Sequence, residues 1–181
     1  MTRDRAPNLG AIFDEHVANE FVAMDVDATM ATMSSDPCVN HVPTMMGGVG
    51  RAAVEKFYAD HFVGHWPSDT TIKPVSRTVG TNRVVDELVL SFTHDVPMDA
   101  FLPGVAPTGR PVRLAVVALV DFEDDKVAAE RIYWDQASLL VQVGLLDDAS
   151  LPVTGSVQAD KVLDNDIRGN QLLCRGRDAA G

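Results

Sequence analysis

The period of the hydrophobic pattern changes once along this chain of 181 residues, and that change constrains the fold most strongly. Up to about residue 63, apolar side chains recur three and four residues apart, as in amphipathic helices. From Thr71 onward they fall into short runs that are separated by polar turns, as in a strand-rich sheet. Helices followed by strands predict an α+β fold, with the helices on one face of a curved antiparallel sheet.

The element boundaries follow from the same patterns. Helices are predicted at 8–22, with Asn8 as N-cap, from Asp25 or Asp27 to 33, at 51–63, at 136–144 and at 156–163. Strands are predicted at 38–44, 71–78, 83–94, 113–122 and 126–134. The segment 47–50 is predicted to be a turn, and its glycines lack the spacing of a dinucleotide-binding loop.

A sheet of this kind needs partners for both of its faces. Residues of both parities are apolar in the run 114–120, so neither face of that strand is polar. The helices are expected to close the concave face into a cone around a pocket for a small apolar molecule. The convex face is predicted to be covered by a second copy of the chain, which gives a homodimer.

Residues 95–110 form a long connection that contains three prolines and two glycines. Loops of this length are uncommon inside compact domains and are often functional. One interpretation is a lid over the pocket mouth, with Met98, Phe101 and Leu102 as its apolar plug. The other is a mobile hairpin connection, and the sequence leaves both open.

Composition excludes several classes of function. The formal net charge is −11 and no basic cluster is present, which argues against nucleic-acid binding. The longest apolar run is too short to cross a membrane. The first eight residues lack the apolar segment of a secretory signal, so a cytoplasmic protein is expected. Cys38 and Cys174 fit no metal-binding spacing and are expected to be independent thiols.

The chain is predicted to form one domain over residues 1–150, followed by an extension over 151–181. Pro152 and Gly155 interrupt the pattern at the start of this extension. One short helix is expected there, followed by a polar, frayed tail from Arg168.

Two segments resemble a known superfamily. Residues 48–58, GVGRAAVEKFY, follow the strand CVNHVPT and resemble the turn and third helix of ketosteroid isomerase relatives. Residues 126–146, KVAAERIYWDQASLLVQVGLL, resemble the terminal strand and helix of SnoaL-like polyketide cyclases, the ester cyclase branch. The resemblance covers residues 9–146 and implies the cone-shaped fold of nuclear transport factor 2 (NTF2-like). It also implies frequent dimers, no metal and no organic cofactor.

The resemblance implies two catalytic positions. The aspartate that is the acid/base for aldol closure in polyketide cyclases matches Asp135, for which the alternative is a helix N-cap. The carboxylate base of ketosteroid isomerases matches His41, a change that argues against steroid isomerisation but leaves a base in place. The alternative for His41 is a structural histidine. The Arg-x-Asp pair of limonene epoxide hydrolases is broken, because Ala115 stands two residues after Arg113.

Further pocket residues are predicted from their positions: Tyr58, Trp134, Tyr133, His16 and Phe101. Alternation along the last strand places Arg131, Tyr133 and Asp135 on one face and Glu130, Ile132 and Trp134 on the other. If Asp135 faces the pocket, Tyr133 should face it too. His16 and Tyr58 also fit ordinary core positions.

Other charged residues are predicted to be structural. Asp86 and Glu87 are adjacent, so they point to opposite faces of the sheet, and the buried one should pair with Arg113 or Arg131. His61 and His65 stand four apart but have no glutamate between them, and their helix is expected to end there, which argues against a metal site.

Two functions of different classes remain open. The first is a cofactor-free acid/base enzyme, a cyclase, isomerase or lyase, that acts on a small apolar carbonyl compound with His41 and Asp135. The second is a non-catalytic small-molecule-binding or dimerisation module of the same fold. They differ in whether two polar groups converge on one cavity.

Overall fold

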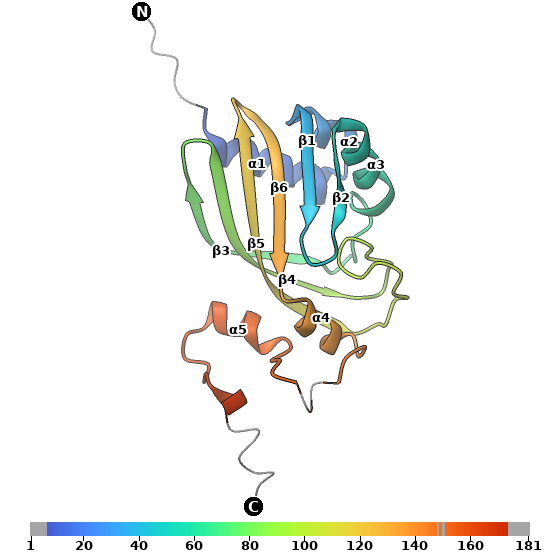
Figure 1. The fold of residues 1–181 in the computed structure, drawn as a ribbon, viewed down its shortest axis with the longest axis vertical. Coiled ribbons are helices and arrows are strands. Elements are labelled where there is room, and N and C mark those ends of the chain that lie inside the picture. Colours follow the sequence, from blue (N-terminus) through green and yellow to red (C-terminus); the bar gives the residue numbers. More distant parts are fainter. Residues whose placement is uncertain (1–6, 148, 150, 174–181) are drawn as a thin grey trace, which may run out of the picture.

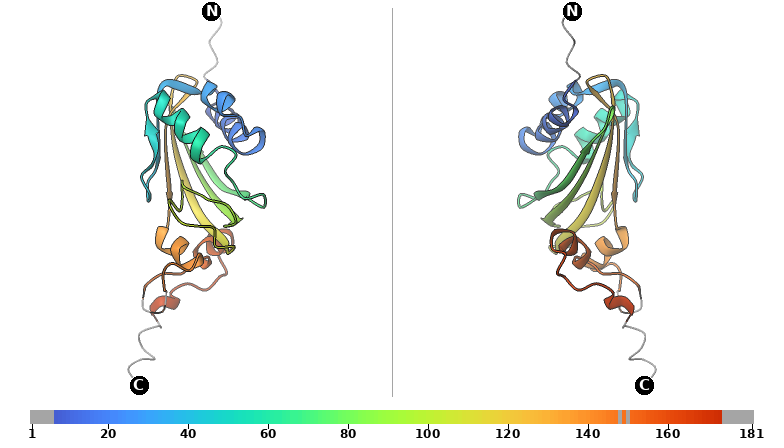
Figure 2. Two further views of the ribbon diagram at one scale, coloured as in Figure 1. Left: turned by 90° about the vertical axis from the view of Figure 1, so that its right-hand side faces the viewer. Right: turned by 90° about the vertical axis from the view of Figure 1, so that its left-hand side faces the viewer.

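A computed structural model describes residues 7–147, 149 and 151–173. Six strands form one curved sheet in the order β2-β1-β6-β5-β4-β3, and α1, α2 and α3 lie against one of its faces (Figures 1 and 2). The strands are β1 (Met33–His41), β2 (Met46–Val49), β3 (Thr71–Val79), β4 (Arg83–Thr93), β5 (Pro111–Glu123) and β6 (Lys126–Trp134). The predicted α+β class and its curved sheet with N-terminal helices are confirmed.

The helices begin and end close to the predicted positions. They are α1 (Leu9–Ala18), α2 (Val26–Ala31), α3 (Arg51–His61), α4 (Gln136–Gln142) and α5 (Val157–Leu163), with a short 3₁₀ turn η2 (Gln171–Leu173). The Asn8 side chain accepts a hydrogen bond from the Ala11 backbone N–H, as expected of an N-cap. The predicted first helix has two parts: α1 is α-helical, and the residues that follow it form a π-helical turn, η1 (Asn19–Ala23). Such wider turns inside helices are frequent at functional sites.

The sheet is mixed, and not entirely antiparallel as predicted. β1 runs parallel to β6, whereas all other neighbouring strands are antiparallel. β1 also starts at Met33, five residues before the predicted strand, and its register with β6 shifts between Met33 and Cys38. That irregular stretch contains Pro37, which cannot donate a ladder hydrogen bond. The sequence could not reveal that β1 and β6 run parallel, because the two strands are far apart along the chain and pair only in the tertiary structure.

The predicted turn at 47–50 is largely the edge strand β2. Gly47 and Gly48 lie within it and pair with β1. A Cβ on Gly47 would stand 2.0 Å from the Val39 carbonyl oxygen, and one on Gly48 would stand 2.6 Å from the Ala53 backbone. The glycines therefore let this strand pass closely between β1 and α3.

The inner face of the sheet carries the core and the outer face is less covered. Along β5 buried residues alternate with half-buried ones, and Ala115, Val117 and Leu119 belong to the second group. At the lower end of the sheet α5 packs against β5 (Figure 1), where Arg113 forms an ion pair with Asp160. The convex face is thus partly apolar, and the homodimer stays a prediction.

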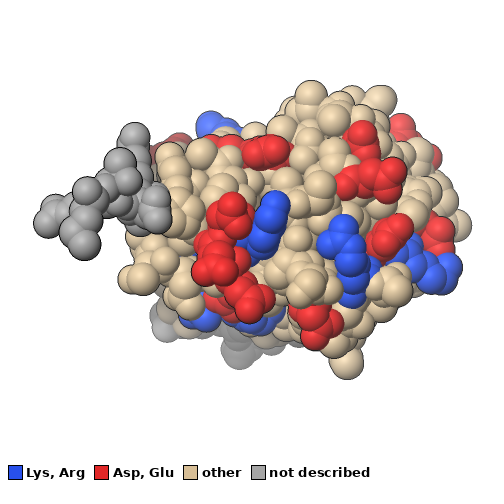
Figure 3. Space-filling model, turned by 90° about the horizontal axis from the view of Figure 1, so that it is seen from above, with Lys and Arg blue, Asp and Glu red and all other residues tan. Residues whose placement is uncertain are grey.

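Several predictions concern residues near the ends of the chain or properties of the chain as a whole. The segment 1–6 and residues 174–181, including Cys174, lie outside the described residues. The tail predicted from Arg168 is described up to residue 173 and contains the turn η2. Cys38 is a free thiol. Within the described ranges, no helix has both the length and the apolar character needed to cross a bilayer. Viewed from above, acidic and basic side chains are interspersed on the surface (Figure 3).

Candidate functional site

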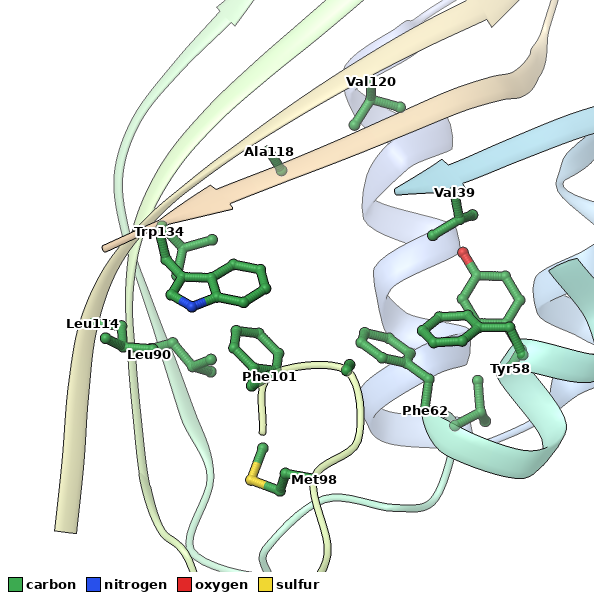
Figure 4. Packing of buried hydrophobic residues seen from close by; sticks show 14 of the residues in the cluster. Val39, Tyr58, Phe62, Leu90, Met98, Phe101, Leu114, Ala118, Val120 and Trp134 are labelled. Carbon is green, nitrogen blue, oxygen red and sulfur yellow. The ribbon is translucent and has the colours of Figure 1, made fainter. Parts of the chain in front are cut away.

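A cavity of about 490 Å³ lies between the helices and the inner face of the sheet. Its walls are mostly apolar, and they come from α1, η1, the segment after α3, the loop 95–110 and strands β1, β3, β4, β5 and β6. Phe62 projects from the end of α3 on one side, and Trp134 and Phe101 lie side by side on the other (Figure 4). A space of this size can hold a small ligand.

The floor of the cavity carries three buried ionisable side chains. His16 comes from α1, Glu20 from η1 and Glu130 from β6, and none of them is more than 6% exposed. His16 Nε2 lies 3.1 Å from Glu130 Oε1 and 3.2 Å from Glu20 Oε1. Both carboxylates line the cavity, whereas the imidazole stands behind them. We refer to these three residues as the floor cluster.

Hydrogen bonds around the floor cluster fix the roles of its atoms. The Thr32 hydroxyl donates to the Thr29 carbonyl at 2.6 Å and lies 2.6 Å from His16 Nδ1. Because the hydroxyl proton is used, His16 Nδ1 carries the proton of that second bond. His16 Nε2 is therefore the nitrogen that exchanges a proton with the carboxylates. Tyr58 donates to Glu130 Oε2 at 3.1 Å, so the Glu130 carboxylate has a donor at each oxygen.

The floor cluster shifts the pKa values of its members in different directions. Burial alone would lower the pKa of His16, but the Glu130 and Glu20 carboxylates outweigh it and raise the pKa to about 10. Burial raises the pKa of Glu20. Glu130 is equally buried, yet the charge and hydrogen bond of His16 and the Tyr58 hydroxyl lower its pKa. His16 is therefore an imidazolium beside the Glu130 carboxylate at neutral pH, and Glu20 holds a proton more strongly than Glu130 does.

His41 lies on the same cavity in a different environment. Its side chain is 1% exposed, and rings of Phe57, Phe62, Phe101 and Trp134 surround it at centroid distances of 5.2–6.0 Å. Neither ring nitrogen forms a well-aligned hydrogen bond, although the Met46 backbone is close enough to act weakly on the pKa of the ring. Burial lowers the pKa of His41 to about 4, against a smaller opposing effect of Glu130. His41 is thus a neutral imidazole with a free nitrogen beside the cavity.

The loop 95–110 supplies part of the wall. Met98, Phe101 and Leu102 are all at most 3% exposed, and the Phe101 ring packs against Trp134 at 4.4 Å between centroids (Figure 4). Thr44 donates to the Ala100 carbonyl and so ties this loop to the end of β1. All three side chains belong to the core, and of the three Phe101 lines the cavity. Whether the loop moves remains a prediction.

Asp135 does not share the cavity with His41. It follows β6 as the N-cap of α4, and its side chain accepts hydrogen bonds from the Ser138 N–H and hydroxyl. The residue is exposed, and Tyr133, on the same face of β6, is 39% exposed. The other face of β6 carries Glu130 and Ile132 into the cavity. The predicted alternation of side chains along β6 is therefore correct, but the face that points into the cavity is the one with Glu130 and Ile132, not the one with Asp135.

The other predicted residues are placed as follows. Phe101 lines the cavity, Trp134 packs directly behind it, and Tyr58 and His16 stand in the second layer, where they contact Glu130. Asp86 is held not by Arg113 or Arg131 but by Arg77 of β3, which binds both of its oxygens at 2.6 Å. Those two arginines pair with other aspartates of the chain.

Two sets of residues differ in whether their side chains converge as metal ligands would. His61 and His65 bond to different partners, Asp99 Oδ2 and the Ala59 carbonyl, and do not converge. In the floor cluster, one donor atom from each residue lies within 4.8 Å of the others, so this set could hold a cation. The tight imidazole–carboxylate contact also accounts for the cluster as an ion pair.

Glu20 and Glu130 were missed at the level of sequence. Glu130 shares the parity of Ile132 and Trp134 on β6, and Glu20 stands four residues after His16, so both signals were present. What was lacking was the knowledge of which face of β6 points inward, and of the π-helical turn that carries Glu20.

Comparison with known proteins gives the family. The model of the SnoaL-like domain matches residues 13–130, which is well over half of the chain. The protein belongs to the SnoaL-like family. A search of curated proteins returned no match.

Solved structures share the fold at low sequence identity. A putative SnoaL-like polyketide cyclase from Jannaschia is 21% identical, with a TM-score of 0.60 over 80% of this chain and 99% of that one. An NTF2-like protein of unknown function from Burkholderia pseudomallei is 19% identical, with a TM-score of 0.57 over 76% and 98%. AclR, a putative hydroxylase from Streptomyces galilaeus, is 21% identical, with a TM-score of 0.56 over 77% and 87%. These matches establish the NTF2-like fold of this SnoaL-like protein.

Proposed function

We propose that this SnoaL-like protein is a cofactor-free acid/base enzyme that moves a proton on a small apolar carbonyl compound, as a cyclase or isomerase does. One observation carries the proposal. Two carboxyl groups, Glu20 and Glu130, face one apolar cavity and have pKa values displaced in opposite directions. Such a divided pair supplies an acid and a base at the same pH.

In the proposed reaction, the Glu130 carboxylate takes a proton from the carbon next to the substrate carbonyl. The electrons of that C–H bond move to the carbonyl oxygen as an enolate. Glu20 then returns a proton at another position, which gives an isomer, or the enolate attacks a second carbonyl, which closes a ring and leaves an alkoxide that Glu20 protonates. His16 lies about 3 Å from both carboxylates and can pass the proton back between them.

His41 is proposed to polarise the substrate carbonyl. A neutral imidazole can donate its ring N–H to a developing oxyanion without losing the proton. The unpartnered ring nitrogens of His41 and its place on the cavity support this role. The neighbouring rings exclude water, which strengthens such a bond. Asp135 has no part in the proposed mechanism.

The proposal is tested by hydrogen–deuterium exchange at carbon. An apolar ketone such as α-tetralone is incubated with the protein in D₂O, and deuterium at the carbon next to the carbonyl is followed by NMR. We expect catalysed exchange that Glu130→Gln reduces by roughly 10²–10⁴-fold, the usual worth of a general base. Asp135→Asn is the control and should keep full exchange, because Asn still caps a helix.

Two outcomes would contradict the proposal. The first is exchange in the wild type that survives Glu130→Gln in a folded variant, with the fold checked by thermal melting. The second is exchange that is lost in Asp135→Asn, which would return the acid/base role to the position that the family resemblance implied. Absence of exchange together with tight ligand binding would favour the non-catalytic binding module.

We also propose that the convex face of the sheet pairs with a second copy of the chain. The half-buried apolar residues of β5, Ala115, Val117 and Leu119, support this. Light scattering at micromolar concentration should then report a dimer of a 19.5 kDa chain. A monomer alone would contradict the proposal.

A further inference from the structure

We propose that the cavity takes an apolar ligand that carries a positively charged nitrogen, and that Glu20 is the group that holds this nitrogen. A ligand of this class would occupy the same cavity in which the proposed function places proton transfer. It does not need turnover, because a molecule of this class can bind whether or not a reaction follows.

The first observation is an unsatisfied oxygen. Glu20 Oε1 is buried at the cavity and forms no hydrogen bond, although His16 Nε2 is 3.2 Å away. This nitrogen carries a single proton, and Glu130 Oε1 is its other neighbour, at 3.1 Å. When Glu20 is ionised, one of its carboxylate oxygens therefore remains without a donor. Buried acceptors without partners are rare, and a ligand N–H would satisfy this one.

The second observation is the charge of the lining. Four carboxyl side chains lie at the cavity, those of Asp14, Glu20, Asp86 and Glu130, against the guanidinium of Arg77 and the His16 imidazolium behind the two glutamates. Arg77 is already used, because it binds both oxygens of Asp86 and also Asp14 at 2.8 Å. His41, the remaining basic group of the lining, is held neutral by burial, which lowers its pKa. The cavity therefore attracts cations and repels carboxylate or phosphate ligands.

The third observation is a group of aromatic rings on the same lining. Phe21 follows Glu20 directly in sequence, and its ring centroid lies 5.8 Å from that of Phe62 and 4.8 Å from that of Trp66. Phe62 and Trp66 stand nearly perpendicular at 5.1 Å. Aromatic faces stabilise alkylammonium groups through their quadrupoles. Apolar side chains such as Ile72, Leu88 and Val116 complete the wall and fit an apolar body.

Protons should be coupled to this binding. Three groups face the Glu20 carboxyl, namely His16 from α1, Tyr58 from α3 and Glu130 from β6. Burial raises its pKa, so a proton is held there more strongly than on an exposed glutamate. A bound ammonium favours the ionised carboxylate and should expel that proton. The affinity for a cation should therefore rise with pH as long as the ligand itself stays protonated.

The test uses three probes of one shape: 2-naphthylmethylamine, 2-naphthalenemethanol and 2-naphthoate. Their binding to the full chain is measured by calorimetry at pH 7. We expect the ammonium to bind about tenfold more tightly than the alcohol, a difference typical of a buried ionic hydrogen bond, and naphthoate to bind weakest. Glu20→Gln should abolish the preference for the ammonium. Glu55→Gln, at an exposed position of α3, is the matched control and should keep it.

A second measurement does not depend on any variant. Calorimetry of 2-naphthylmethylamine in two buffers that differ in ionisation enthalpy should reveal proton release on binding. Equal affinity for the ammonium and naphthoate probes, or an unchanged preference in folded Glu20→Gln, would overturn the inference. So would Zn²⁺ binding that Glu20→Gln removes while none of the naphthyl probes binds, since the cation would then be a metal. Loss of deuterium exchange alone affects only the proposed function.

Discussion

Two buried histidines lie close to the same cavity, His41 in its wall and His16 behind the two glutamates, and their environments shift their pKa values in opposite directions. Burial disfavours the charged form of both, but only His16 has carboxylates within hydrogen-bond distance. The pKa of His16 is therefore raised to about 10, while that of His41, among aromatic rings, is lowered to about 4. The comparison shows that partners, and not depth of burial, decide the charge of a group in this cavity.

The largest expected effect comes from removing the partner of His16. Glu130→Ala takes away the nearest carboxylate and leaves a buried imidazolium next to a carboxyl group that is itself hard to ionise. We expect the free energy of unfolding to fall by about 3–5 kcal/mol, as for other buried pairs that lose one member. Urea denaturation at pH 7 measures this.

A neighbour on the same strand provides the control for that change. Arg131 pairs with Asp121 on the outer face of β6, where its side chain is 32% exposed. Arg131→Ala should cost at most about 1 kcal/mol, as for exposed pairs. An equal loss of unfolding free energy in both variants would contradict the difference in burial between the two faces of β6.

The next effect concerns pH and His41. Its folded pKa of about 4 lies below its ordinary value of 6.5, so the unfolded chain binds more protons between these values. This contribution to stability is present above pH 6.5 and is lost as the pH falls toward 4. His41→Phe, which suits the aromatic surroundings, should reduce this acid-induced decrease in the free energy of unfolding by up to about 3 kcal/mol. Denaturation curves between pH 4 and 7 measure it.

His16 should behave in the opposite sense. Its folded pKa lies above the ordinary value, so its contribution to stability is present below pH 6.5 and is lost as the pH rises through about 10.

The control for the His41 prediction is His65, which is exposed. His65→Asn should leave the dependence of stability on pH between pH 4 and 7 unchanged. An acid limb that is identical in wild type and His41→Phe would contradict the assigned environment of His41.

The smallest effect belongs to Asp135, an acid on the solvent side of β6. Asp135→Ala removes the N-cap of α4 and should cost about 1 kcal/mol, whereas Asp135→Asn should change stability by only a few tenths. Thermal melting of both variants measures this difference. A large loss of stability in Asp135→Asn would indicate that the carboxylate charge does more than cap a helix.

The contrast between the faces of β6 also explains how far sequence reasoning could go. The alternation of Glu130 and Ile132 with Arg131 and Tyr133 could be seen in the sequence, because side chains of a strand point to opposite faces in turn. Both sets contain charged and apolar residues, so polarity did not reveal which set faces inward. The family resemblance favoured Asp135, and the structure places Glu130 on the cavity instead.

The sequence by itself determined the local elements of this protein. The helical periods, the strand alternation and the caps at Asn8 and Asp135 depend on neighbours a few residues apart, and most of them lie where they were predicted. The parallel pairing of β1 with β6, the inward face of β6 and the meeting of His16, Glu20 and Glu130 were decided only by the tertiary structure. These features join residues that are up to 114 positions apart, and local propensity contains no information on which distant segments pack together.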